Sequence, residues 1–187
     1  MHDDTRRLTA FAGTRRIAAG TMDDILGPVR AAAPEDQVLV FDDRTGRVVD
    51  LDLRPGSAPP TSGAAQDGPR RRGRPKLGVV AREVTLLPRH WDWLSAQPGG
   101  ASQALRRLVD KARREDGGAT DRRAAQAAAF AFMNALAGDL PRFEAATRAL
   151  FASDADAFGQ EMRDWPADLA AYAWALAHPD PADIDPD

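Results

Sequence analysis

The chain has 187 residues, of which 43% are hydrophobic, and it contains no cysteine. This length suits one domain or two small ones, and the lack of cysteine excludes disulfide frameworks and thiol chemistry. No apolar run approaches the roughly 18 residues of a membrane span, and acids stand near the N-terminus where a secretory signal is basic. We therefore expect a cytoplasmic protein with no membrane segment.

Positive charge is concentrated in the middle of the chain, although the formal net charge is −3. Residues 1–69 carry 8 basic and 11 acidic residues, residues 70–114 carry 12 and 3, and residues 115–187 carry 5 and 14. The central segment therefore has a net charge of +9, and the C-terminal segment has a net charge of −9. This asymmetry indicates either a polyanionic partner for the centre or pairing between the two segments.

The first segment predicts a small α+β domain over residues 1–53 with the order ββαββ. Short apolar runs on either side of Gly13 predict a hairpin, Thr21 predicts a helix N-cap, and DDRTG at 42–46 predicts a second hairpin. Residues 54–70 are rich in Pro, Gly, Ser and Ala, which is typical of a flexible linker.

Helical patterns dominate after the DGG break at 116–118. Apolar residues at helical spacing predict four helices within residues 119–178, forming an acidic helical domain. The last residues, 179–187, are acidic and interrupted by proline, which predicts a disordered tail. The expected fold class is α+β: a ββαββ unit, a central strand-helix-helix segment and a C-terminal helical bundle.

Residues 69–78 read PRRRGRPKLG. Glycine lets the backbone lie close to a groove and proline holds the segment extended, so the arginines can point along the negative A·T minor groove. RGRP at 72–75 resembles the core of an AT-hook. The alternative is a solubilising basic linker. The residues that carry the DNA-binding prediction here are Arg70, Arg71, Arg72, Gly73, Arg74 and Lys76.

Residues 82–114 predict a strand, a short helix, a glycine turn and a longer helix. The strand covers 82–87, Pro88 starts a short helix with Trp91 in the core, and Ser102 caps the longer helix. This order resembles a ribbon-helix-helix module, in which two chains pair their strands into one ribbon that enters the major groove of DNA.

The resemblance implies a homodimer through strand 82–87, because a lone strand with two short helices cannot bury its apolar face. If the strand turns Glu83, Thr85 and Leu87 to the bases, only Thr85 can hydrogen-bond a base edge, which favours backbone contacts over sequence-specific readout. The alternative is a strand-helix-helix piece of one larger core. The DNA contacts expected from this module are Arg82, Thr85, Arg89, Ser102 and Arg106.

Three long blocks of the chain resemble an uncharacterised bacterial family, a domain of unknown function. The blocks are RGRPKLGVVAREVTLLPRHWDWL, ALRRLVDKAR and FMNALAGDLPRFEAATRALF, and they run over most of residues 71–152. The resemblance implies kinship and brings no activity with it.

The expected function is DNA binding, as in a transcriptional regulator, with RNA as a second polyanion that the basic segment would accept. Nothing in the sequence predicts an enzyme, a cofactor or a metal site, because His2, His90 and His178 are far apart and no nucleotide loop is present. The alternative is a protein-protein interaction protein whose basic centre pairs with acidic surfaces, including its own C-terminal domain.

Overall fold

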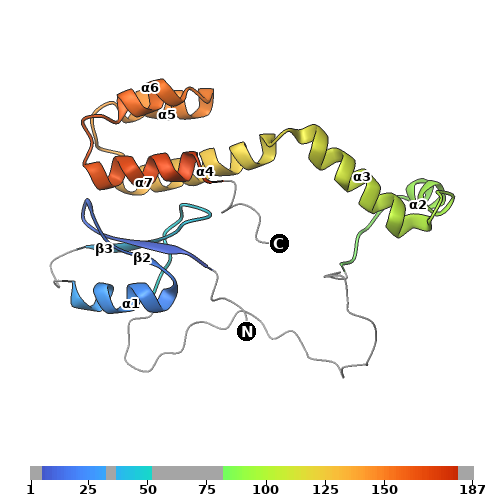
Figure 1. The fold of residues 1–187 in the computed structure, drawn as a ribbon, viewed down its shortest axis with the longest axis horizontal. Helices are drawn as coiled ribbons and strands as arrows, with labels where there is room; N and C mark the ends of the chain where they lie inside the picture. Colours follow the sequence, from blue (N-terminus) through green and yellow to red (C-terminus); the bar gives the residue numbers. More distant parts are fainter. Residues whose placement is uncertain (1–5, 33–36, 52–81, 181–187) are drawn as a thin grey trace. The chain divides into compact units, whose positions relative to one another are not determined.

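The computed structural model describes residues 6–32, 37–51 and 82–180 (Figure 1). The chain divides into two compact units: unit 1 combines residues 1–57 with 118–187, and unit 2 comprises residues 58–117. The basic segment at 70–76 and the linker expected before it lie outside the described residues, as does the tail from residue 181.

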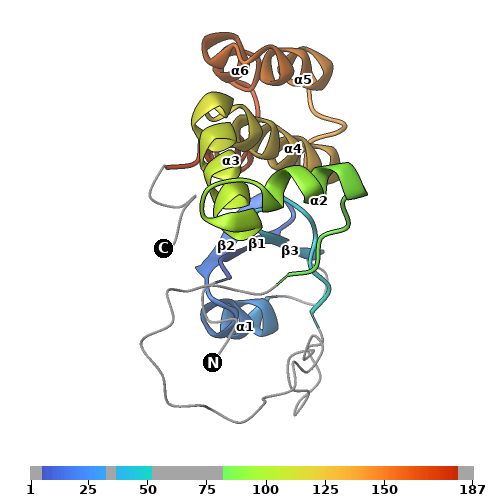
Figure 2. The ribbon, with the colours of Figure 1, turned by 90° about the vertical axis from the view of Figure 1, so that its right-hand side faces the viewer.

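Unit 1 contains a three-stranded antiparallel sheet with the strand order β2-β1-β3 (Figure 2). The strands are β1 (Leu8–Ala12), β2 (Arg15–Gly20) and β3 (Val38–Asp42). The fourth strand predicted from residue 47 is not formed among the described residues: residues 47–51 make one isolated bridge, between Phe41 and Val48. Asp50 is a poor strand residue, and this segment lies at the edge of the sheet, where pairing on one side alone supports it.

Helix α1 (Met22–Ala31) covers one face of the sheet (Figure 1). Thr21 is its N-cap, as predicted, and both its backbone N–H and its hydroxyl donate to the Asp24 carboxylate at 2.8 Å. Successive side chains of a strand point to opposite faces of the sheet, so alternate side chains of these strands point toward the helix. The buried residues of this layer are Leu8, Ala10, Ile25, Val29 and Val40.

The opposite face of the sheet packs on the C-terminal helices. These are α4 (Ala119–Leu136), α5 (Phe143–Ala152), α6 (Ala155–Glu161) and α7 (Ala167–Ala177). Helices α4 and α7 lie on the sheet, and α5 and α6 lie on their outer side (Figures 1 and 2). Phe11 and Phe41 of the sheet meet Phe132 of α4 and Tyr172 of α7, with ring centroids 4.7–6.5 Å apart. Each such pair contributes about 0.5–1.5 kcal/mol beyond its burial.

The N-terminal α+β segment and the helical segment, expected as separate domains, share this aromatic core within unit 1. A sheet has two faces, and α1 covers one of them, so Phe11 and Phe41 would be exposed without the C-terminal helices. Gly46 lies close to the backbone of α4, where the sheet meets the helices. Its φ is +62°, and a Cβ on it would overlap the carbonyl oxygen of Ala128 in α4.

Unit 2 contains α2 (Pro88–Ser95) and α3 (Gly100–Asp116). Pro88 is the first residue of α2, as predicted, but Trp91, expected in the core, is 39% exposed. Residues 82–87, predicted as a strand, have no regular secondary structure in the single chain. A strand needs a neighbouring backbone to complete its hydrogen bonds, and no described segment pairs with this one.

The fold class is therefore α+β, as predicted. The described residues form one three-stranded sheet and seven helices.

Candidate nucleic-acid interface

The predicted DNA contacts that the structure describes all lie in unit 2, and all are exposed. They are Arg82, Thr85, Arg89, Ser102 and Arg106. Ser102 lies in the first turn of α3 and is not its N-cap, because the helix begins two residues earlier, after Gly99. The other predicted contacts lie outside the described residues: Arg70, Arg71, Arg72, Gly73, Arg74 and Lys76.

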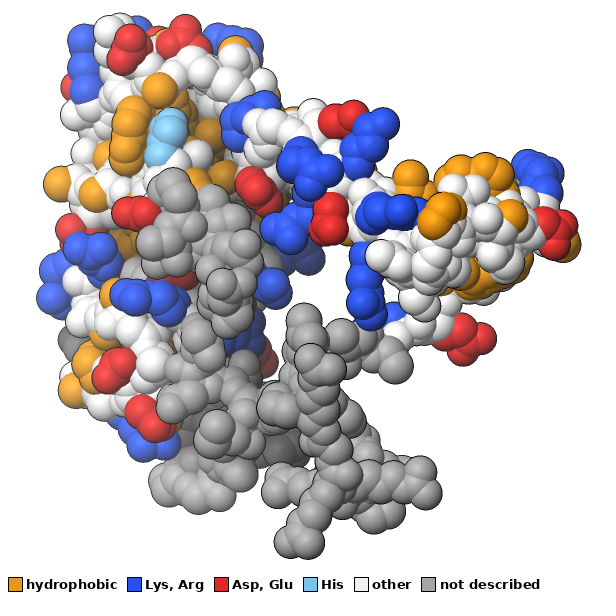
Figure 3. Space-filling model, turned by 45° about the vertical axis from the view of Figure 1, so that its right-hand side comes forward, with side chains coloured by type: hydrophobic (Ala, Val, Ile, Leu, Met, Phe, Trp, Pro, Cys, Tyr) orange, Lys and Arg blue, Asp and Glu red, His pale blue; other side chains and the backbone are white. Residues whose placement is uncertain are grey.

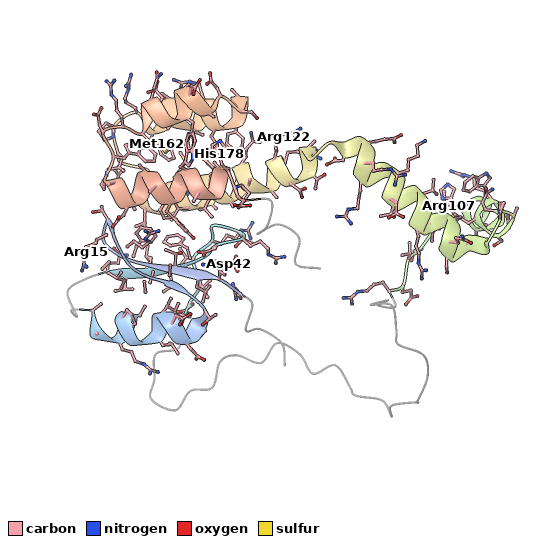
Figure 4. All side chains as sticks on the ribbon, in the orientation of Figure 1. Arg15, Asp42, Arg107, Arg122, Met162 and His178 are labelled. Atoms are coloured by element: carbon pink, nitrogen blue, oxygen red, sulfur yellow. The ribbon has the colours of Figure 1, made fainter. Side chains whose placement is uncertain are left out.

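Hydrogen bonds hold the turn between α2 and α3. The Gln97 N–H donates to the Leu94 carbonyl at 3.2 Å, and the Gly100 N–H donates to the Gln97 carbonyl at 2.9 Å. The Arg107 guanidinium, labelled in Figure 4, donates to the Pro98 carbonyl at 3.3 Å. A guanidinium has five N–H groups, so Arg107 ties α3 to the turn and still presents donors at the surface.

Helix α3 has one cationic face and one apolar face, because residues of each kind recur at helical spacing. The cationic face consists of Arg106, Arg107, Lys111, Arg113 and Arg114, with Asp110 among them. In Figure 3, basic side chains (blue) gather along the surface formed by α3. Lys111 lies 3.6 Å from Glu115, but both side chains are well exposed, so this ion pair neutralises little of the charge.

An apolar groove of about 320 Å³ lies between α2, α3 and the segment that precedes them. Its lining residues are Leu86, His90, Trp93, Leu94, Leu105 and Leu108, with no lysine, arginine, aspartate or glutamate among them. Figure 3 shows apolar side chains (orange) gathered at the end of the unit that contains α2. Phosphates require cations, so this groove suits an apolar partner, whereas the cationic face suits a polyanion.

Asp42 of unit 1 lies where β3 enters a turn (Figure 4). Its carboxylate accepts hydrogen bonds from Arg6 Nε at 2.6 Å and from the N–H and hydroxyl of Thr45 at 3.0 and 3.2 Å. Burial alone would raise the pKa of Asp42, but the hydrogen bonds and the charge of Arg6 hold that pKa below its ordinary value. The ionised carboxylate therefore stabilises the turn after β3, which approaches α4.

Asp43, the next residue, joins the sheet to α7. It accepts hydrogen bonds from the Thr9 hydroxyl at 2.8 Å and from the Tyr172 hydroxyl at 2.7 Å. Burial, reinforced by the negative charge of Asp43, raises the pKa of Tyr172, so the phenol stays protonated and donates. These bonds connect segments of unit 1 to one another, which assigns the cluster to the fold.

Histidines lie on aromatic and apolar surfaces in both units. His90 lines the groove of unit 2, and the ring of His178 stacks on Trp174 of α7 with centroids 4.1 Å apart. Within the described ranges, no group of three or more His, Cys, Asp or Glu residues could hold a metal ion. None of the described helices is both long and apolar enough to cross a membrane.

Sequence reasoning finds the cationic face in part. It includes Arg106 but omits the other four cations of that face, although helical spacing after Gly100 already places them on one side of α3. The omitted residues are Arg107, Lys111, Arg113 and Arg114. It does not find the groove, which depends on how the turn brings Trp93 of α2 near Leu108 of α3. Helical spacing predicts the faces of each helix, whereas the path of the turn sets the groove.

A family model described as an uncharacterised protein conserved in bacteria (DUF2239) matches residues 7–177. The match spans most of unit 1 as well as the groove and cationic face of unit 2. No curated protein and no solved structure matches the chain. The chain belongs to this family of uncharacterised proteins conserved in bacteria.

Proposed function

We propose that this protein binds DNA through unit 2, including the basic segment at 70–76, as a transcriptional regulator would. The observation that carries the proposal is the exposed cationic face of α3, which lies within a stretch of net charge +9. Charge of this density attracts a polyphosphate, because each phosphate contact releases condensed counterions.

The basic segment supplies the second part of the proposed interface. Its RGRP core resembles an AT-hook, and two arginines separated by glycine suit a narrow A·T minor groove. The third part is the ribbon-helix-helix-like module proposed for residues 82–114. In such a module residues 82–87 would form a strand by pairing with a second copy, whereas in the structure they have no regular secondary structure.

Binding of a labelled A·T-rich duplex, followed by fluorescence anisotropy at several salt concentrations, tests the proposal. Replacing Arg72 and Arg74 by Ala is expected to weaken binding about tenfold or more and to make the salt dependence shallower. Arg106→Gln is expected to weaken binding a few-fold, uniformly across duplex sequences.

Arg30→Gln is the matched control, because it also removes one exposed arginine from a helix but lies in unit 1. It is expected to leave DNA affinity unchanged. Equal affinity of the wild type and the Arg72/Arg74 variant would remove the basic segment from the interface. Failure of the wild type to bind any duplex at low salt would reject DNA as the ligand, and tighter binding of single-stranded RNA would point to RNA.

The alternative function is protein-protein interaction through the basic centre, and the net charge of −9 in residues 115–187 favours it. The chain has only two lysines, Lys76 and Lys111, so every lysine crosslink that a carbodiimide forms with a carboxylate is assigned to one of these two side chains. Coupling of Lys111 to Glu115, 3.6 Å away, serves as the internal positive control. Coupling of Lys76 to carboxylates of residues 121–187 in the free protein would support this alternative, and its absence would speak against it.

A further inference from the structure

The described part of unit 2 exposes more large apolar side chains than it buries. Only Leu94 and Ala104 are buried apolar residues in the described part of the unit. Other large apolar side chains are 39–56% exposed: Val84, Leu87, Trp91, Trp93, Leu108 and Val109. Monomeric proteins rarely expose apolar patches larger than a few hundred Å², so a surface of this kind marks an interaction site.

We infer that the apolar groove between α2 and α3 is the core of a homodimer interface, occupied by the same face of a second copy. In this arrangement Trp93 of each copy inserts into the groove of the other. The inference deepens the proposed function, on which it rests for the role of the dimer in presenting two cationic faces to DNA. It differs from strand pairing alone, because it assigns the main contact to the helices.

The chemistry of the groove selects an apolar occupant. No lysine or arginine lines it, so neither a nucleic acid nor an acidic peptide would find a permanent counter-charge there. The cations of α3 lie on the other side of the helix, so two copies can meet at the groove without bringing arginines together.

The same face offers both a hollow and protruding side chains, which is what a two-fold interface requires. Trp93, which lines the groove, is 53% exposed. Val109 is 56% exposed and lies one turn of α3 after Leu105, another lining residue. At about half exposure, the six exposed side chains leave roughly 600 Å² accessible per copy if all of them enter the contact, which is the low end of the area per partner in specific interfaces.

The described residues of unit 1 do not offer a matching surface. The exposed large apolar residues among them are Val48, Phe151 and Trp174, which come from the segment after β3, from α5 and from α7. These three side chains compare with six in the described part of unit 2, so a second copy of unit 2 is the better complement.

Sedimentation equilibrium of the full chain at micromolar concentrations tests the inference. The wild type is expected to have twice the mass of one chain, and Val109→Glu and Trp93→Ser are each expected to raise the dimer dissociation constant by about tenfold or more. Val48→Glu is the matched control: it is the same substitution at a valine of similar exposure, 49% against 56%, but in unit 1. It is expected to leave the dimer intact.

A wild type that is monomeric at tens of micromolar, or a Val109→Glu variant that dimerises like the control, would overturn the inference. A monomer that binds vesicles of anionic lipid through unit 2 would overturn it in favour of a membrane surface. The duplex-binding assay separates this result from the proposed function. A dimer that Val109→Glu dissociates but that binds no DNA would uphold the interface and reject the function, and DNA binding by a wild-type monomer would do the reverse.

Discussion

Unit 1 and unit 2 bury their apolar side chains to very different degrees. In unit 1 the sheet is covered on both faces, and Phe11, Phe41 and Phe132 have no exposed surface. In unit 2 two helices bury only Leu94 and Ala104 among the described residues. The contrast teaches that unit 1 carries its own core, whereas the described part of unit 2 leaves most of its apolar side chains exposed, as the proposed dimer interface requires.

The largest expected effect concerns the core of unit 1. Phe132→Ala removes a ring that meets Phe11, Phe41 and Tyr172 at 5.3, 5.0 and 4.7 Å, and we expect it to lower the free energy of unfolding by about 3–5 kcal/mol. Phe151→Ala, at a ring that is 53% exposed, is expected to cost about 1 kcal/mol or less. Chemical denaturation followed by circular dichroism measures both, and similar losses would mean that unit 1 lacks a central core.

The next effect concerns the contact between the two halves of unit 1. Gly46→Ala forces a Cβ into the backbone of α4 at a positive φ, so we expect a loss of about 3 kcal/mol or more. Gly13→Ala is the matched control, because its φ of +56° is similar but nothing lies within 4 Å of the added Cβ. At Gly13 we expect the substitution to lower the free energy of unfolding by about 1–2 kcal/mol, from backbone strain alone. Equal losses in thermal unfolding would show that the turn does not press on α4.

The third prediction tests the independence of unit 2. Leu94→Ala removes the largest buried side chain there, and we expect a loss of about 2 kcal/mol, at the low end for leucine because the surrounding core is thin. The loss should appear as faster proteolysis within 88–116, while the unfolding transition of unit 1 keeps its midpoint. A downward shift of that midpoint would show that the two units unfold together.

The smallest effect concerns the bond between Tyr172 and Asp43. Tyr172→Phe removes a hydrogen bond to a carboxylate, with an expected loss of about 1–2 kcal/mol at pH 7. The folded-state pKa of Tyr172 is raised, so its contribution is complete below the unfolded value near 10 and is lost as the pH rises above it. We therefore expect wild-type stability to fall more steeply above pH 10 than that of the variant. Parallel pH profiles would contradict the raised pKa.

Much of unit 1 could be predicted from the sequence, because its signals are local. Thr21 caps a helix, and apolar periodicity marks the strands before it and the helices after residue 118. The joint core could not be predicted, because Phe11 and Phe132 are distant in the chain and nothing local pairs them. The prediction of a fourth strand was wrong at residues 47–51 for a related reason. The apolar residues there favour a strand, whereas Asp50 and the position at the edge of the sheet disfavour one.

The charge of the candidate interface can be predicted from the sequence, whereas its shape is harder to predict. Helical spacing places the cations of α3 on one side, so Arg106 could be chosen from the sequence. The lack of regular structure at 82–87 could not be foreseen, because strand propensity at Val84 and Leu86 is realised only when a partner strand is present. The groove depends on the α2–α3 turn and is a property of packing.

Hydrogen exchange of the full chain, measured by mass spectrometry over a range of protein concentrations, tests most directly whether unit 2 is completed by a second copy. Backbone amides of α2 and α3 are expected to gain protection as the concentration rises, while those of β1, β3 and α4 stay equally protected throughout. Protection of α2 and α3 that matches unit 1 at every concentration would contradict the account, because unit 2 would then be stable on its own.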